Sequence, residues 1–375
     1  MGDSLYVGLM SGTSVDAVDS ALVRCTSAGQ ELVATHEHAI PVAIRQRIAA
    51  LSHSGPDEIE RMGALDRELG RLFAEASLQL LASVDIQPGQ VTAIGSHGQT
   101  IRHRPPSGAE PGAESFTLQI GDPSTIAEAT GITTVADFRR RDIAAGGEGA
   151  PLAPAFHAAT FAKEGVNRAI VNIGGIANAT LLRDLNLHRG FDTGPGNTLL
   201  DHWIARHRNA AFDRDGQWSA QGEVIPALLQ QCLQHPYFAR SGPRSTGKEM
   251  FNLNWLDRIL DSIQQPTPRD VQATLAELTA SSIANGLMNS ELEVAEVYIC
   301  GGGAHNTDLM HRLQRKLAPA VVDNTSAIGL DPDWVEAATF AWLARQTLGG
   351  LAGNAPVVTG AAGARVLGGV YPGEG

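Results

Sequence analysis

Two stretches of this chain share a plan that strongly limits the folds open to it. Each is an apolar, strand-forming run that breaks at small residues and then returns as a second strand. The first is YVGLMSGTSVDAVDSALV (6–23), and the second is NRAIVNIGGIANATLL (167–182). One glycine-broken hairpin in each half of the chain, among further alternating strands and helices, indicates two duplicated α/β domains.

Composition supports two domains and excludes several classes of protein. The chain has 375 residues, and one domain commonly has about 100–200. A net charge of −12 argues against a nucleic-acid or membrane-surface binder, since both need basic patches. Cys25, Cys232 and Cys300 are too far apart in sequence to suggest a disulfide framework or a zinc site. With no signal peptide and no apolar run of about 18 residues, we expect a soluble cytoplasmic protein.

The break in the first hairpin has the composition of a phosphate-binding turn. Gly12, Thr13 and Ser14 offer unobstructed backbone N–H groups and two hydroxyls, and several such donors can converge on one anion. In the returning strand, Asp16 or Asp19 could hold Mg²⁺ through water, because this ion keeps much of its hydration shell. The alternative is an ordinary hairpin with polar turn residues.

A second candidate is the segment GFDTGPGNTLLD (190–201), which surrounds Asp192 with glycines. We expect a rigid loop here, with Pro195 fixing the turn and a helix starting near Thr198. Close to a helix N-terminus Asp192 stays ionised, as a general base must. The alternative is that Asp192 only caps or closes a turn, which is common for Asp.

Two further segments carry polar residues suited to a small ligand. GSHGQT (95–100) places His97 between glycines at a strand end, where ligands gather in α/β sheets. ADFRRRDIAAGGEGAPLAPAF (136–156) puts three arginines and Asp142 before a glycine loop, and one guanidinium there could grip a carboxylate bidentately. The alternatives are a structural histidine and a solvated charged turn.

Two other glycine-rich motifs do not fit the nucleotide-binding patterns that they approach. GPRSTGKE (242–249) has P-loop spacing, but Glu249 replaces the Ser or Thr that binds magnesium, and no buried strand precedes it. The triple glycine 301–303 follows a good strand, yet Asn306 stands where a dinucleotide fingerprint has its last glycine.

Taken together, the segments resemble the anhydro-N-acetylmuramic acid kinases of bacterial peptidoglycan recycling. The resemblance covers nearly the whole chain through GLMSGTSVDAVD, IGSHGQTIRH, ADFRRRDIAAGGEGAPLAPAFH, VNIGGIAN, GFDTGPGN, STGKEMFN, ICGGGAHN and WVEAATFAWLA. It implies the sugar kinase, Hsp70 and actin-like fold, two α/β domains with a nucleotide cleft between them. We expect an N-terminal domain over 1–135, a C-terminal domain over 136–349, and a segment 350–375 that packs back on the first.

The same resemblance implies an unusual reaction. Water attacks the anomeric carbon of 1,6-anhydro-N-acetylmuramic acid while the freed O6 takes the γ-phosphate of ATP, giving N-acetylmuramate 6-phosphate and ADP. Asp192 matches the family's catalytic base, and magnesium bound to ATP stabilises charge on the transferring group. A homodimer is also a family expectation.

The resemblance assigns the remaining contacts residue by residue. Sugar contacts carry over to His97, Arg139 and Glu336. The implied ATP contacts are Gly12, Thr13, Ser14, Val15, Asp16, Ala17, Val18, Asp19, Gly174, Gly175, Gly301, Gly302 and Gly303. In two places the chain departs from the family pattern: Val15-Asp16-Ala17 replaces Leu-Asp-Gly, and Glu148 replaces a glutamine.

Two other functions remain open from the sequence. One is another sugar kinase of this superfamily, whose base deprotonates a free hydroxyl instead of water. The other is a nucleotide-dependent scaffold or chaperone of the Hsp70 and actin type, which needs no sugar site. The segments GFDTGPGN and GSHGQT weigh against a scaffold, and turnover of a sugar panel with Mg-ATP separates all three functions.

Overall fold

The computed structural model describes residues 3–12, 14–26, 29–108, 112–239 and 250–373. The chain forms two compact units, Met1–Thr160 with Trp334–Gly375, and Phe161–Asp333. These limits differ from the expected domain boundaries, because residues 136–160 and 334–349 also belong to the first unit. Thr160 there donates a hydrogen bond to the side chain of Gln30 (2.6 Å).

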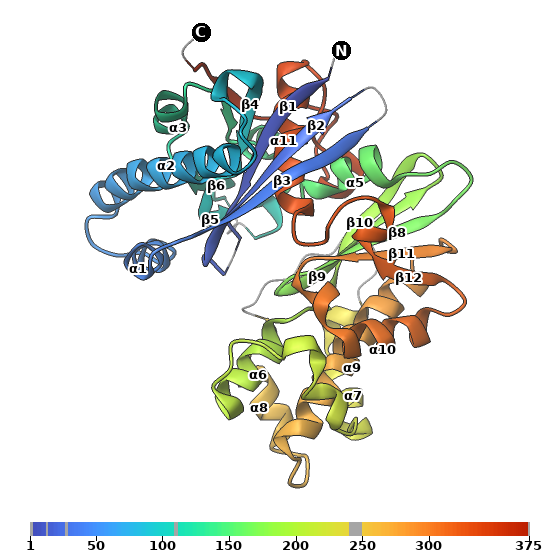
Figure 1. Ribbon diagram of the computed structural model, residues 1–375. Helices are drawn as coiled ribbons and strands as arrows, with labels where there is room; N and C mark the ends of the chain where they lie inside the picture. The colour runs from blue at the N-terminus through green and yellow to red at the C-terminus, as the bar shows by residue number, and fades with distance from the viewer. Residues whose placement is uncertain (1–2, 13, 27–28, 109–111, 240–249, 374–375) are drawn as a thin grey trace. The chain divides into compact units, whose positions relative to one another are not determined.

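The first unit is built on a six-stranded sheet in the order β13-β7-β4-β1-β2-β3 (Figure 1). Its strands are β1 (Ser4–Met10), β2 (Ala17–Cys25), β3 (Gln30–Ala39), β4 (Val91–Ser96), β7 (Thr134–Ala136) and β13 (Gly369–Tyr371). β1, β2 and β3 run antiparallel to one another, whereas β4 lies parallel to β1 and β7 parallel to β4.

The second unit repeats this plan with a five-stranded sheet in the order β10-β9-β8-β11-β12. Its strands are β8 (Arg168–Ile173), β9 (Ile176–Arg183), β10 (Asn186–Pro195), β11 (Glu296–Cys300) and β12 (Val321–Asn324). Three antiparallel strands are again followed by two parallel ones. The two hairpins β1–β2 and β8–β9 therefore hold equivalent positions, which confirms the duplication and the α/β fold class expected from the sequence.

Helices cover the sheet of the first unit on both faces. The long helix α2 (Glu58–Ser83) buries an apolar stripe against β2 and β3, in a core that includes Leu9, Val18 and Leu22. Helix α11 (Val335–Leu348) lies on the opposite face, against β1 and β4. The unit also contains α1 (Val42–Leu51), α3 (Pro123–Thr130), α4 (Arg140–Ala144), α5 (Ala153–Phe161) and α12 (Pro356–Thr359).

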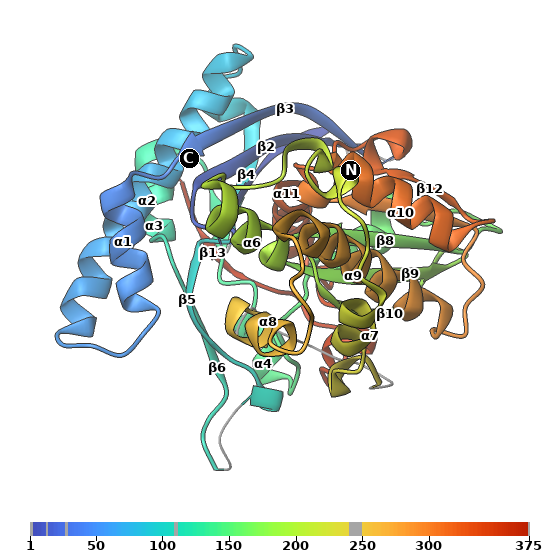
Figure 2. The same ribbon diagram turned by 90° about the horizontal axis from the view of Figure 1, so that it is seen from below.

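A separate two-stranded sheet, β5 (Gln99–Arg104) and β6 (Phe116–Ile120), belongs to the same unit. Figure 2 shows this pair extending as a long hairpin. Its first strand begins two residues after His97, so the hairpin starts beside a predicted ligand residue.

The second unit has two apolar cores. Helices α9 (Pro268–Met288) and α10 (Thr307–Leu317) pack on its sheet and form the first core. The second core lies among α6 (Thr198–Arg208), α7 (Pro226–Leu233), α8 (Leu253–Leu260) and α9. Thr267 caps α9 by accepting a hydrogen bond from Asp270 N (3.2 Å).

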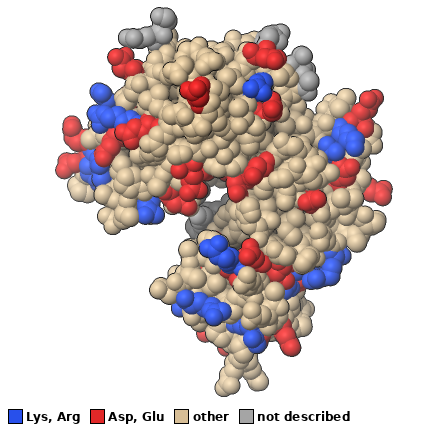
Figure 3. Space-filling view, viewed as in Figure 1, with Lys and Arg blue, Asp and Glu red and all other residues tan. Residues whose placement is uncertain are grey.

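Within the part of the chain that the structure describes, no helix is both long and apolar enough to span a membrane. On the face shown in Figure 3, acidic side chains are interspersed with basic ones.

Helix α11 lies unusually close to the sheet because two paired residues of β1 and β4 are glycines. Gly8 is the register partner of Gly95. A Cβ at Gly8 would lie 1.8 Å from Ala337 O, and one at Gly95 would lie 2.0 Å from Phe340 O. The helix backbone thus rests on strand backbone, an approach that any side chain at these positions prevents.

We predict that Gly95→Ala destabilises the protein by about 1–3 kcal/mol, because the added methyl group must push α11 off the sheet. Gly63→Ala is the matched control: a methyl group on Gly63, within α2, would have no described atom within 4 Å, and alanine there should stabilise by about 0.5–1 kcal/mol. Urea unfolding measures both changes. Equal stability of Gly95→Ala and the wild type would show that α11 is not held by this contact.

Candidate active site

The opening hairpin turns between Met10 and Ala17, where the sequence predicts a phosphate site. Ser14 Oγ donates a hydrogen bond to the Asp16 carboxylate (2.6 Å), and Val15 N donates to Gly12 O (3.3 Å). Ser14 and Asp16 are exposed, as residues that meet a ligand must be. Thr13, also expected to contact ATP, lies outside the described residues.

Among the described residues of this turn, Val15 is left-handed, with φ 59°, and Gly12 is not. A β-branched residue in this conformation is strained. Val15 packs against the core of the first unit, and such packing is what holds a strained residue in place. Ala17 and Val18 begin β2 and are buried, Val18 completely, so they support the turn instead of lining it. Asp19 is half-buried and pairs with Met10 across the hairpin.

The predicted sugar-binding residues His97, Arg139 and Glu336 come together in the first unit. Arg139 Nε and Nη2 both donate to His97 Nε2 (3.0 and 2.9 Å), and Nη1 donates to Gly149 O (2.9 Å). Burial lowers the pKa of Arg139 to about 10, and the nearby negative charges of Glu336 and Asp142 oppose this lowering. Glu336 is exposed in the first turn of α11.

His97 is a neutral acceptor in this cluster. Burial holds its pKa well below the usual value, and the positive charge of Arg139 lowers that pKa further. With Nε2 accepting from Arg139, the ring proton resides on Nδ1. The ring also packs on Phe340 of α11, with ring centroids 4.8 Å apart. His97 therefore orients Arg139 by accepting its hydrogen bonds and, being neutral, does not repel the positive charge of the guanidinium.

A buried hydrogen bond links the opening turn to this cluster. Ser11 Oγ donates to Gln99 Oε1 (2.7 Å) at the start of β5, and His97 N donates to Leu9 O (3.0 Å). The predicted phosphate turn and the predicted sugar residues of the first unit are thus joined directly. The sequence did not predict a role for Gln99.

In the second unit, the Gly174-Gly175 turn is fixed against the start of α6. Gly174 O accepts from Asn197 N (2.8 Å), and Gly175 O accepts from Gly196 N (3.0 Å) and Thr198 N (3.2 Å). A side chain at Gly174 would meet only Ile176 O, at 3.7 Å, among the described atoms. A ligand can therefore approach this turn closely.

Asp192 lies in the edge strand β10, so the rigid loop expected around it is wrong, as are the cap and turn alternatives. The segment up to Pro195 pairs with β9, with a register shift between Asp192 and Gly194. Tyr237 Oη donates to Asp192 O (2.7 Å), which fixes the backbone at that point. The predicted helix start at Thr198 is confirmed.

The sheet register places Asp192 in a polar row that sequence reasoning missed. Asp192 is the partner of Asn178 on β9, and Asn178 is the partner of Asn172 on β8. Directly paired residues point to the same face of a sheet. All three are half-buried. The signal in the sequence is NIGGIAN, in which the two asparagines stand at opposite ends of the glycine turn.

The glycines 301–303 lie at the end of β11, beside the end of β8. A Cβ at Gly301, where φ is 74°, would lie 2.3 Å from Asn172 Oδ1, whereas Gly302 is open. Asn306, which interrupts the dinucleotide fingerprint, caps α10 by accepting from Leu309 N (3.0 Å).

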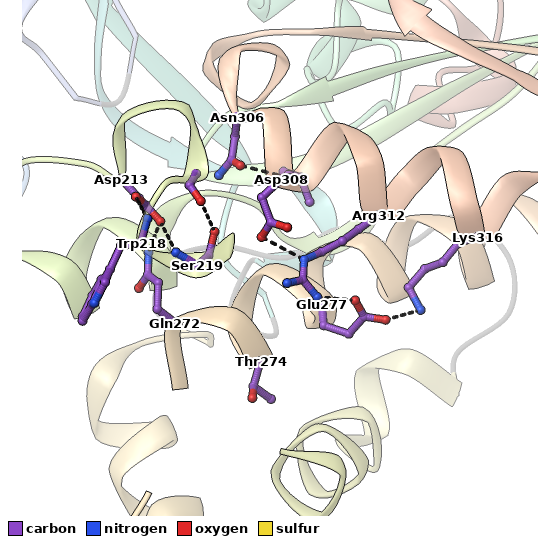
Figure 4. A network of polar contacts seen from close by, with 12 residues as sticks. Asp213, Trp218, Ser219, Gln272, Thr274, Glu277, Asn306, Asp308, Arg312 and Lys316 are labelled. Carbon is purple, nitrogen blue, oxygen red and sulfur yellow. Dashed lines mark hydrogen bonds and ion pairs between the residues drawn. The ribbon is translucent and has the colours of Figure 1, made fainter. Parts of the chain in front are cut away.

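An ion-pair network anchors α10, which follows these glycines (Figure 4). Arg312 is buried and donates to Asp308 (2.9 Å) on its own helix and to Glu277 (2.7 Å) on α9, and Lys316 also pairs with Glu277 (2.5 Å). The network holds the start of α10, and with it the glycine turn, against α9.

The described side chains contain no cluster of three His, Cys, Asp or Glu residues that could hold a metal ion on its own. Mg²⁺ does not require one, since it binds through one or two carboxylates plus water and substrate phosphates. The exposed Asp16 carboxylate beside the opening turn has the chemistry for this. The predicted P-loop match 242–249, with Lys248, lies outside the described residues.

The sequence profile of the family described as anhydro-N-acetylmuramic acid kinase matches residues 4–373. The chain belongs to this family. Three curated relatives that bear the family's name are similar in length and sequence. The relative from Shewanella sp. (strain MR-4) is 51% identical over 374 residues, which is 99% of both chains. The relative from Pseudomonas putida (strain KT2440) is also 51% identical, over 369 residues, which is 98% of this chain and 99% of its own. The relative from Coxiella burnetii (strain Dugway 5J108-111) is 52% identical over 371 residues, which is 98% of both chains.

For this family member, we predict that Gly12→Val folds but loses at least about tenfold in kcat/KM for ATP, because its side chain obstructs the backbone donors of the turn. Folding should survive, since a side chain at Gly12 would meet only Ser14 Oγ, at 4.0 Å, among the described atoms, and Gly12 has no positive φ. Lys248→Ala is the control and should retain ATP use. Calorimetry and melting temperature accompany the kinetics. If the lysine variant lost nucleotide binding and a folded Gly12→Val kept it, the phosphates would lie elsewhere.

Proposed function

We propose that this chain is an ATP-dependent kinase that opens 1,6-anhydro-N-acetylmuramic acid with water and phosphorylates O6. The observation that carries this proposal is about 50% identity over the full length to relatives named anhydro-N-acetylmuramic acid kinase. The polar row ending at Asp192 and the Arg139 cluster supply the base and the cationic group that the reaction needs.

Asp192 has the role of general base. Its carboxylate takes a proton from water as the water oxygen bonds to the anomeric carbon. The bond from that carbon to the bridging O6 then breaks, and O6 bonds to the γ-phosphorus of ATP as ADP leaves. The bonds of Tyr237 to Asp192 O and of Thr193 Oγ1 to Ala177 O (3.1 Å) hold β10 in place, so the base is positioned before substrate binds.

Arg139 has the role of binding the lactyl carboxylate of the sugar. Three of its five N–H donors are engaged inside the first unit, which leaves two for a ligand. A charged, oriented guanidinium is the side chain best suited to a carboxylate.

ATP takes contacts from the opening turn and from the glycines 174–175 and 301–303. When bound with ATP, Mg²⁺ supplies positive charge against the transferring phosphoryl group. Asp16 or Asp19 would hold the ion through water. We further expect a cytoplasmic homodimer acting in cell-wall recycling, and sedimentation of the purified protein checks the oligomeric state.

The reaction proposed here puts oxygen from water on the sugar. In ¹⁸O-water, product collected within minutes should carry the label on its anomeric oxygen and none in phosphate. N-acetylmuramate 6-phosphate kept in labelled water for the same time corrects for exchange at that carbon. Mass spectrometry locates the label. An unlabelled sugar would indicate phosphorylation of an existing hydroxyl, and labelled inorganic phosphate would indicate ATP hydrolysis.

We predict that Asp192→Asn lowers kcat by at least about 100-fold, because it removes the base while keeping the side chain's size. ATP affinity by calorimetry should stay near that of the wild type. Asp323→Asn makes the same change at an exposed carboxylate on β12, the opposite edge of the same sheet, and should retain kcat. A kcat above about a tenth of the wild-type value in Asp192→Asn would remove Asp192 from this role.

A further inference from the structure

A fully buried carboxylate, Asp142, lies beside the Arg139 cluster. Asp142 is 0% exposed and belongs to α4. It accepts three hydrogen bonds: from Gly149 N (2.9 Å), from Asn354 Nδ2 (2.8 Å) and from Thr359 Oγ1 (2.9 Å). Burying a charge is unfavourable unless hydrogen bonds satisfy it, so these donors are what allow the carboxylate to remain here.

Two of the three donors come from the far end of the chain. Asn354 and Thr359 lie after α11, in the segment that ends with α12, and are 212 and 217 residues away from Asp142 in sequence. The same segment makes backbone bonds to the glycine loop: Glu148 N donates to Thr359 O (2.8 Å), and Ala362 N donates to Ala145 O (2.8 Å). The C-terminal segment is thus hydrogen-bonded along residues 142–149.

The third donor, Gly149, links Asp142 to Arg139. Gly149 gives its N–H to Asp142, and its carbonyl oxygen accepts from Arg139 Nη1. Two glycines of the loop are packed too closely, or bent too sharply, to carry a side chain. A Cβ at Gly147 would lie 2.3 Å from Asp142 Oδ2, and Gly149 has φ 68°. Any movement of Asp142 therefore moves the carbonyl that orients Arg139.

We propose that Asp142, held by Asn354 and Thr359, is a positioning residue for Arg139, so that the C-terminal segment sets the affinity for the sugar. The inference rests on the proposed function, in which Arg139 binds the substrate carboxylate. Asp142 itself acts only through Gly149 and Arg139, since its carboxylate is enclosed by donors.

The test is Thr359→Val, which removes one donor to Asp142 while keeping the shape of the side chain. We expect KM for the anhydro sugar to rise about tenfold, because the lost bond is to a charged group, while KM for ATP stays within about twofold. Thr359→Ser keeps the hydroxyl and should restore the wild-type KM. Asn354→Ala removes the other side-chain donor and provides the same measurement if Thr359→Val does not fold.

The matched control is Thr347→Val. Thr347 Oγ1 donates to Leu343 O (2.9 Å) and contacts Leu367 O (2.5 Å) in the same unit, without touching Asp142. This variant should lose stability at most and keep both KM values. If Thr347→Val raised the sugar KM as much as Thr359→Val does, the bonds to Asp142 would only support the fold and would not position Arg139.

A double-mutant cycle with Arg139→Ala decides whether the effect passes through the arginine. If it does, adding Thr359→Val to Arg139→Ala changes the sugar KM no further. A full additional tenfold rise in the double variant, or an unchanged KM in an active Thr359→Val, would overturn the inference. Failure of the wild-type protein to convert the anhydro sugar with ATP would instead overturn the proposed function.

Discussion

Close approach of helix α11 to the backbone of Gly8 and Gly95 is the constraint on which the first unit depends. With no side chain between them, helix and sheet can lie close enough for Phe340 to pack on His97. The helix also carries Glu336 at its start and leads into the C-terminal segment. From the end of α11, that segment continues to Asn354 and Thr359, which donate to Asp142. The packing of one helix on two glycines thus also places a ring against His97, which accepts from Arg139.

The second unit depends on strand register instead. Pairing of β8, β9 and β10 puts Asn172, Asn178 and Asp192 in one row, beside the glycine turn that joins β8 to β9. A slip of one residue would turn Asp192 to the other face of the sheet. At the register shift, Gly194 has φ 152°, a conformation that residues with a side chain rarely adopt, and a Cβ there would lie 2.9 Å from Phe238. The base that we propose at Asp192 would therefore lie on a register-fixed strand with little freedom to move, which would suit proton transfer to a positioned group.

Much of the fold was predictable because its signals are local. Apolar runs broken at small residues predicted both hairpins, and the residues after Pro195 predicted the start of α6 near Thr198. Family motifs identified Asp192, His97, Arg139 and Glu336, and the last three do come together. The expected loop around Asp192 was wrong because its glycines resemble a turn, whereas pairing with β9 keeps the segment extended.

The sequence by itself determined the duplicated hairpins, the α/β class and the family, since periodicity, glycine breaks and ordered motifs can be followed along the chain. Only the tertiary structure decided that His97 accepts from Arg139 and that Asn354 and Thr359 hold Asp142. It also decided where the first unit resumes, at Trp334. These contacts join residues far apart in sequence, and their geometry follows from helix packing and strand pairing, which no local pattern of residues records.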